Sequence, residues 1–230
     1  MEVRTIFRKL GKQNGKKSSG KFFRGTLVDM LQKRGDCAVC LFCEEELKKF
    51  YWWYFYDYHG KPSWIIRVSE SNGFCCRHGW DILKMKKASQ MSFVYRYLVK
   101  DTLKKLEKMA SQGYKESRKY IKPTNICPIC EQITDISTSW TRQLVKYLED
   151  EEIKELYLSS SGLCMNHFDQ AFFFASPNVC LILIEKQSRE FKKLSSDLEE
   201  FSSALAEQIC KPGEEKAYIR AIGLFTGRRL

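Results

Sequence analysis

The sequence predicts an all-α protein made of two related helical repeats, each held together by a Cys3His zinc site, with a long coiled-coil-like helix near the C-terminus. Three observations predict this fold. A C-x2-C … C-x2-H pattern occurs twice, apolar residues recur at helical spacing in most segments, and only one short segment reads as a strand. The 230 residues are enough for one sizeable core or for two domains of roughly 100 residues each.

The duplication is clearest in the residues that can bind metal. Cys37-Ala-Val-Cys40 recurs 90 residues later as Cys127-Pro-Ile-Cys130, and Cys75-Cys-Arg-His78 recurs 89 residues later as Cys164-Met-Asn-His167. The chain has three histidines, and two of them stand at matching places in the two repeats. Chance is a poor explanation of this match.

Three thiolates and one imidazole around an ion are typical of a closed, structural zinc site. We expect one such site in each repeat, and the glycine before each C-x2-H motif, Gly73 or Gly162, permits a positive φ at the entry to the motif. The expected ligands are Cys37, Cys40, Cys75 and His78 in the first repeat, and Cys127, Cys130, Cys164 and His167 in the second.

Two other interpretations of the cysteines remain open. Buried free cysteines pack as small apolar side chains, and Cys37, Cys40 and Cys43 together spell a C-x2-C-x2-C motif that is reminiscent of iron–sulfur ligation. The second repeat has Ile133 in place of Cys43 and Met165 in place of Cys76, so the alignment favours zinc and sets both extra cysteines aside.

These motifs resemble those of an uncharacterised bacterial family of helical proteins with tandem CPxC…GFCxxH zinc-binding repeats. The matching residues lie in Cys37–Cys40, Gly73–His78, Cys127–Cys130 and Gly162–His167, and the resemblance covers about residues 25–225. It implies a helical fold and bound zinc, and it implies no activity. The chain departs from the family pattern at Ala38 and Leu163, neither of which is a ligand.

Hydrophobic periodicity places the remaining elements. Helices are expected over 40–58, 81–109, 179–210 and 214–225, with one or two more within 131–157, and a strand is expected over 63–69. The helix over 179–210 carries a stripe that either faces the core or forms the seam of a homodimer, consisting of Phe191, Leu194, Leu198, Phe201, Leu205 and Ile209.

Composition divides the chain into four parts: a flexible basic arm over 1–21, a first repeat over 22–110, a linker over 111–126, and a second repeat with C-terminal helices over 127–230. Residues 1–34 carry a net charge of +8, out of +11 for the whole chain.

No apolar run is long enough to span a membrane, and no secretory signal is evident. A cytoplasmic location is the default expectation, and ten cysteines in a reducing compartment favour metal binding.

The function with the best support from the sequence is that of a zinc-binding, non-catalytic binding or adaptor protein. Seven consecutive aromatic residues over 50–56 cannot all face one core. Those that do not face it either pack against the second repeat or form a surface that binds a protein partner. The candidates for this surface are Trp52, Trp53 and Tyr56, together with the nearby His59.

Two alternatives remain open. In the first alternative, the protein binds nucleic acid through an aromatic surface and the basic arm, and the candidate polyanion contacts are Lys9, Lys12, Lys16, Lys17, Lys21 and Arg24. In the second, it is an enzyme or cofactor-binding protein with a pocket between the repeats near Trp52, Trp53 and His59. Common catalytic motifs are absent from the sequence, which argues against an enzyme.

Overall fold

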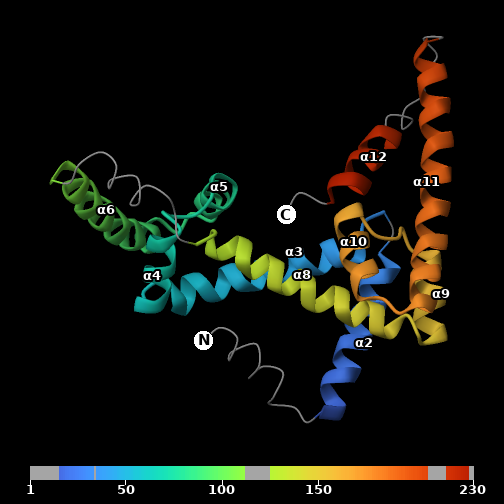
Figure 1. Ribbon diagram of the computed structural model, residues 1–230, viewed down its shortest axis with the longest axis horizontal. Helices are drawn as coiled ribbons and strands as arrows, with labels where there is room; N and C mark the ends of the chain where they lie inside the picture. The colour runs from blue at the N-terminus through green and yellow to red at the C-terminus, as the bar shows by residue number, and fades with distance from the viewer. Residues whose placement is uncertain (1–15, 34, 112–124, 207–215, 228–230) are drawn as a thin grey trace. The chain divides into compact units, whose positions relative to one another are not determined.

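The computed structural model describes residues 16–33, 35–111, 125–206 and 216–227, and the regular structure within these ranges is helical, with no strand. The all-α prediction is confirmed. The helices, most of them labelled in Figure 1, are α2 (Lys16–Gln32), α3 (Ala38–Trp53), a π-helix (Tyr54–Tyr58), α4 (Pro62–Glu70), α5 (Cys76–Lys84), α6 (Ala88–Ser111), α8 (Pro128–Tyr147), α9 (Glu151–Ser159), α10 (Met165–Phe174), α11 (Pro177–Ala206) and α12 (Lys216–Thr226).

The chain forms two compact units that differ from the two sequence repeats. Unit 1 combines Met1–Glu44 with Ser137–Leu230, and unit 2 is Glu45–Ile136. The division between the units falls inside α3, after Glu44, and inside α8, before Ser137. Each unit therefore takes residues from both repeats, which bears directly on how the metal ligands combine.

Unit 1 is built on the apolar face of α8 and the helices that follow it. Leu144, Leu148, Tyr157 and Leu183 are among its fully buried side chains, and Trp140 packs against Phe42 from the start of α3. α2 contacts α9, and α12 contacts both α10 and α11 (Figure 1).

In unit 2 the aromatic run divides between the core and the solvent. Trp64 of α4 packs against Phe50, Tyr54 and Tyr58, and α4 in turn contacts α6. The run ends in a π-helical turn, where the His59 N–H donates to the Tyr54 carbonyl oxygen at 2.9 Å. A π-helical turn is wider than an α-helical one, so it shifts the residues that follow it around the axis.

Two expectations about secondary structure were wrong. Residues 63–69 are helical, within α4, because Pro62 starts a helix well and Trp64 and Val68 are buried at i,i+4 spacing. The helix expected over 81–109 is two helices, α5 and α6, separated by a turn in which Lys86 has a φ of 55°.

Residues 16–21 of the expected basic arm belong to α2, which begins at Lys16. Residues 1–15 and most of the expected linker lie outside the described residues. None of the helices in the described part of the chain is long and apolar enough to cross a membrane.

α12 packs along part of the apolar stripe of α11. Phe225 contacts Phe191, with ring centroids 5.4 Å apart, and Tyr218 contacts Phe201 at 6.0 Å. Leu194 is buried and Leu205 is half exposed, while Ile209 lies outside the described residues. The described stripe therefore serves at least partly for packing within the unit.

The packing of α11 can be tested with two leucines that are two residues apart. Leu183 is fully buried and Leu181 is 67% exposed. We expect Leu183→Ala to lower the free energy of unfolding by about 2–5 kcal/mol, because it leaves a cavity in the core. Leu181→Ala should lower it by less than about 0.5 kcal/mol. Urea unfolding followed by circular dichroism at constant zinc measures both, and equal losses would contradict this orientation of α11.

Candidate metal centres

All four ligand motifs sit in the first turn of a helix. Cys75 and Cys164 are the residues directly before α5 and α10, and Cys37 and Cys127 stand directly before α3 and α8. In each motif the second ligand follows three residues later, so the two side chains lie on the same face of the first turn. The carbonyl oxygens of all four leading cysteines accept helical hydrogen bonds, from Leu41, Gly79, Glu131 and Phe168.

The glycines before the C-x2-H motifs have the conformation that the sequence predicts. Gly73 has a φ of 98° and Gly162 a φ of 72°. A side chain would strain the backbone at either position, and at Gly73 a Cβ would also lie 3.2 Å from the Leu98 side chain. These turns direct each C-x2-H motif into its helix.

The first centre, in unit 1, consists of Cys37, Cys40, Cys164 and His167. The Nδ1 of His167 lies 3.4 Å from the sulfurs of Cys37 and Cys40 and 3.2 Å from that of Cys164. The sulfurs of Cys40 and Cys164 are 3.7 Å apart. The start of α3 and the start of α10 thus bring their ligands to one point.

The second centre, in unit 2, consists of Cys75, His78, Cys127 and Cys130. The Nδ1 of His78 lies 3.2, 3.7 and 3.3 Å from the sulfurs of Cys75, Cys127 and Cys130 respectively. The sulfurs of Cys75 and Cys130 are 3.7 Å apart. Here the ligands come from the starts of α5 and α8.

The structure brings all eight expected ligands into two Cys3His groups, but it pairs them differently from the sequence-based expectation. Each centre takes its C-x2-C from one repeat and its C-x2-H from the other. The expectation that each repeat closes its own site is therefore wrong. The physical reason is that α3 and α8 each pass from one unit to the other, so the two ligand motifs of a repeat belong to different units.

The separations fit a single tetrahedral ion. For metal–sulfur bonds of about 2.3 Å and metal–nitrogen bonds of about 2.0 Å, a tetrahedron has S···S edges of about 3.8 Å and S···N edges of about 3.5 Å. The four ligand atoms of each centre all lie within 4.8 Å of one another, and the closest pairs are near these edges. Both groups are therefore compatible with a bound ion.

The charges of the first centre also favour a cation. Burial alone would lower the pKa of His167, but its hydrogen bonds with Cys164, Cys40 and Cys43 raise it to about 11. Without metal, the imidazole therefore holds a proton against the sulfurs. A metal ion would displace that proton, so the affinity for metal must fall as the pH is lowered.

In the second centre the two C-x2-H ligands are closer to their metal-binding forms. Burial, together with the charge of Arg77, lowers the pKa of His78 and keeps its imidazole neutral. Burial acts to raise the pKa of Cys75, but backbone N–H groups of His78 and Arg77 hydrogen-bond to its sulfur and lower the pKa overall. By contrast, burial and the nearby Cys127 raise the pKa of Cys130 to about 12.

The outer nitrogens of the two histidines have different surroundings. The Nε2 of His167 lies 3.0 Å from the Ser137 hydroxyl, and both Ser137 and Thr141 donate to the side-chain oxygen of Gln170. The Nε2 of His78 is buried and has no hydrogen-bond partner among the described residues. Sequence reasoning missed this difference, because Ser137 and Gln170 belong to no recognisable motif.

The two extra cysteines are outside both groups. Cys43 is fully buried in α3 beside His167, and Cys76 is exposed at the first position of α5. Neither belongs to the eight clustered ligands.

The candidate partner residues are mostly exposed. Trp52 is 58% exposed, Trp53 46% and Tyr56 72%, whereas Phe50, Tyr51, Tyr54 and Phe55 on the same run are buried. His59 is half-buried, and its ring packs edge-on against Phe93.

The candidate polyanion contacts remain untested. Lys9 and Lys12 lie outside the described residues; Lys16, Lys17 and Lys21 are in α2. The Arg24 guanidinium pairs with Asp150 and Glu152, so its charge is already balanced inside unit 1.

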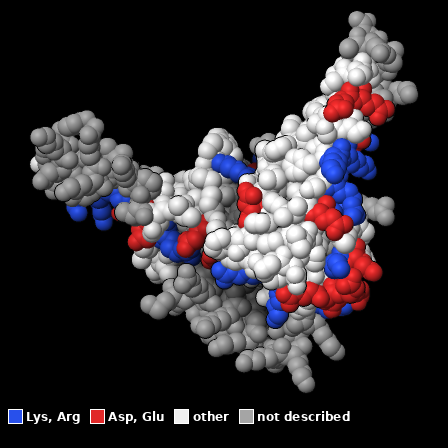
Figure 2. All heavy atoms as spheres, turned by 45° about the vertical axis from the view of Figure 1, so that its right-hand side comes forward, with Lys and Arg blue, Asp and Glu red and all other residues white. Residues whose placement is uncertain are grey.

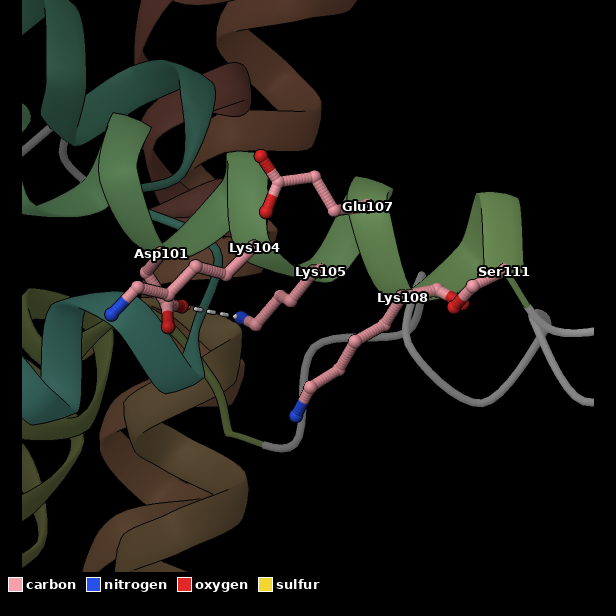
Figure 3. Close-up of a pocket in the computed structure, with 6 residues that line it drawn as sticks. All are labelled: Asp101, Lys104, Lys105, Glu107, Lys108 and Ser111. Carbon is pink, nitrogen blue, oxygen red and sulfur yellow. Dashed lines mark hydrogen bonds and ion pairs between the residues drawn. The ribbon is translucent and has the colours of Figure 1, made fainter.

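A shallow pocket lies along α6 in unit 2, and none of its lining residues is a ligand of either centre. Its lining residues all come from this one helix, and Figure 3 shows Lys105 paired with Asp101 there, at 2.8 Å. Lysines and acidic residues alternate along it, and most of them are exposed. This arrangement is typical of a solvated helix face and does not form a site.

The model of one family, described as a family of unknown function (DUF6062), matches residues 85–208, more than half of the chain. The matched segment contains the four ligands of the second repeat, and thus half of each centre. No curated protein and no solved structure is significantly similar to the chain.

Pairs of substitutions can test how the ligands combine. Cys40→Ser with Cys164→Ser disables only the first centre, so one metal ion per chain should remain. Cys127→Ser with Cys164→Ser disables both centres, so none should remain. If each repeat closed its own site, these two outcomes would be exchanged.

The measurement is metal analysis by mass spectrometry after gel filtration. Cys180→Ser is the control, since Cys180 is a half-buried cysteine outside both groups, and this variant should keep two ions.

Proposed function

Since the chain belongs to the DUF6062 family, whose function is unknown, we propose a function from its own side chains: a non-catalytic binding protein whose two units are held in shape by structural zinc. The observation that supports this most directly is the pair of closed Cys3His groups. Four side-chain ligands complete a tetrahedron around zinc, whereas a catalytic zinc keeps one position open for water or substrate.

Zinc is the metal that this donor set suits best. Three thiolates and one imidazole in a tetrahedral arrangement are typical of structural zinc. An iron–sulfur cluster contains several irons and sulfides, and its protein ligands must stand around all of them. Sulfurs separated by 3.7 Å leave room for one ion between them, which favours zinc over iron–sulfur.

The proposed binding surface consists of Trp52, Trp53 and Tyr56, which we call the aromatic surface. The rings of Trp52 and Tyr56 are stacked, with centroids 5.1 Å apart and an angle of 9° between their planes, and Trp53 meets both edge-on. Tyr and Trp side chains are enriched where proteins bind one another, and here three of them are grouped.

The charges around the aromatic surface favour a protein partner over a polyanion. On either side of the aromatic run in the sequence, Lys48 pairs with Glu45, Lys49 with Glu46 and Lys61 with Asp57. These three ion pairs leave no excess of positive or negative charge among them. Nucleic-acid binding depends on neutralising phosphates with uncompensated cations. On the face that Figure 2 shows, basic and acidic side chains are also interspersed among the described residues. The partner that fits is therefore a protein with an apolar, weakly charged surface.

A reducing compartment such as the cytoplasm suits this proposal. The centres require six cysteines as thiolates, and oxidation to disulfides would release the metal.

Substituting the aromatic surface tests the proposal. A partner that is captured by the wild-type protein and then purified should bind Trp52→Ala or Trp53→Ala at least about 30-fold more weakly, the loss of a hot-spot side chain of about 2 kcal/mol. Isothermal titration calorimetry measures this difference.

Trp80→Ala is the matched control. Trp80 is 63% exposed, belongs to the same unit and lies on a different helix, so its loss should leave the affinity unchanged. Equal losses in all three variants would contradict the proposed surface. Binding that disappears after nuclease treatment, or that weakens steeply with salt, would favour the nucleic-acid alternative instead.

A further inference from the structure

The two centres have the same ligands but different surroundings. Metal-bound histidines usually donate their outer N–H to a partner, and removing such partners typically weakens metal affinity about 10–100-fold. His167 has this partner in Ser137, at 3.0 Å. His78 has none among the described residues.

The repeat alignment explains this difference. Position 47 of α3 corresponds to position 137 of α8, because the C-x2-C motifs before these helices are 90 residues apart. The residue at the first of these positions is Leu47, which is buried and cannot accept a hydrogen bond. The second repeat thus supplies a polar outer partner, Ser137, at the position where the first repeat has the aliphatic Leu47.

Two of the three cysteines of the first centre are buried and Cys37 is partly exposed, whereas the second centre has one buried cysteine. Cys40 and Cys164 are each 2% exposed. Gly227, just after α12, lies directly over them: a Cβ at this residue would stand 3.2 Å from the Cys164 sulfur and 3.3 Å from the Cys40 sulfur. In the second centre Cys75 and Cys130 are both partly exposed, and only Cys127 is a buried cysteine.

From these differences we infer that the two zinc ions exchange at different rates: the second centre, in unit 2, releases its ion readily and the first centre retains its own. The inference rests on the proposed function in one respect, namely that both centres hold zinc. A competing thiol or chelator can approach the partly exposed sulfurs of the second centre, and its histidine lacks the hydrogen bond that would keep the ring oriented.

The second centre also adjoins the buried side of the aromatic run. Tyr54, on the buried side of the aromatic run, packs edge-on against Phe74, which directly precedes the ligand Cys75. Tyr51 is buried on the same side. Loss of the second ion therefore frees the segment on which the run packs, and binding through Trp52 and Trp53 becomes dependent on zinc supply.

The decisive experiment follows zinc release from the full-length wild-type protein. A chromogenic chelator, 4-(2-pyridylazo)resorcinol, is added in excess, and the released zinc is recorded by absorbance. We expect two phases of equal amplitude whose rates differ at least about 10-fold, in line with the effect of outer-shell partners.

Alkylation assigns the phases without any substitution. Iodoacetamide is added at the end of the fast phase, and the labelled cysteines are mapped by mass spectrometry. We expect label on Cys75, Cys127 and Cys130 and protection of Cys40 and Cys164. Hydrogen exchange at the same time point should increase in α4 and α5 and stay unchanged in α9 and α11.

Three variants test the physical cause. Ser137→Ala should accelerate the slow phase about 10-fold, because it removes the partner of His167. Ser139→Ala, an exposed serine on the same helix, is the matched control and should leave both phases unchanged. Leu47→Ser should slow the fast phase by giving His78 a partner.

The outcomes separate this inference from the proposed function. A protein that contains fewer than two zinc ions, and takes up no more from a zinc buffer, overturns the proposed function and this inference with it. Two zinc ions released at one rate, or early label on Cys40 and Cys164, overturn this inference alone.

Discussion

The structure depends on one arrangement, in which two helix N-termini point at each group of three sulfurs and one imidazole. A closed Cys3His zinc site carries a net negative charge, because three thiolates outweigh the 2+ ion. The free N–H groups and the dipole of a helix N-terminus stabilise such a charge, by up to about 1 kcal/mol for each helix at exposed positions. The backbone N–H groups that lower the pKa of Cys75 are an example of this effect. The same helices then lead away from the metal and form the core of each unit.

The ligand pairs are nested along the chain. Cys75 and Cys130, whose sulfurs meet in the second centre, are 55 residues apart in the sequence. Cys40 and Cys164, whose sulfurs meet in the first centre, are 124 residues apart and enclose the first pair. Closing a loop costs chain entropy that grows slowly with its length, so neither closure is prohibitive. Once the inner pair has formed, the outer pair has a shorter effective chain to close. Chain entropy therefore favours closing the inner pair, in unit 2, before the outer pair in unit 1, which combines segments from both ends of the chain.

The sequence was informative about residue types and less so about partners. It predicted the eight ligands, the helical class and the positive φ of Gly73 and Gly162, because each follows from local chemistry at a few positions. It could not predict how the motifs pair, since both C-x2-C motifs are chemically equivalent and either can complete either site. That choice depends on α3 and α8 passing between the units. The strand expected over 63–69 failed for a related reason: β-branched residues favour a strand locally, but the packing of Trp64 and Val68 favours a helix.

The aromatic run shows how one short segment can serve both the core and the surface. In a regular α-helix, seven consecutive aromatic residues would surround the axis, and about half of them would meet solvent without any particular arrangement. In the π-helical turn at Tyr54–Tyr58, Tyr54 and Phe55 are buried, with Tyr54 against Trp64 of α4, and Tyr56 stacks on Trp52. π-turns are rare, and they are enriched at functional sites because their irregular geometry is retained only where it has a use. Here one short segment carries an exposed aromatic stack on one side, while Tyr54 on its other side packs against Phe74, the residue before the ligand Cys75. Any change in the packing of this ligand segment therefore reaches the aromatic run through direct side-chain contact.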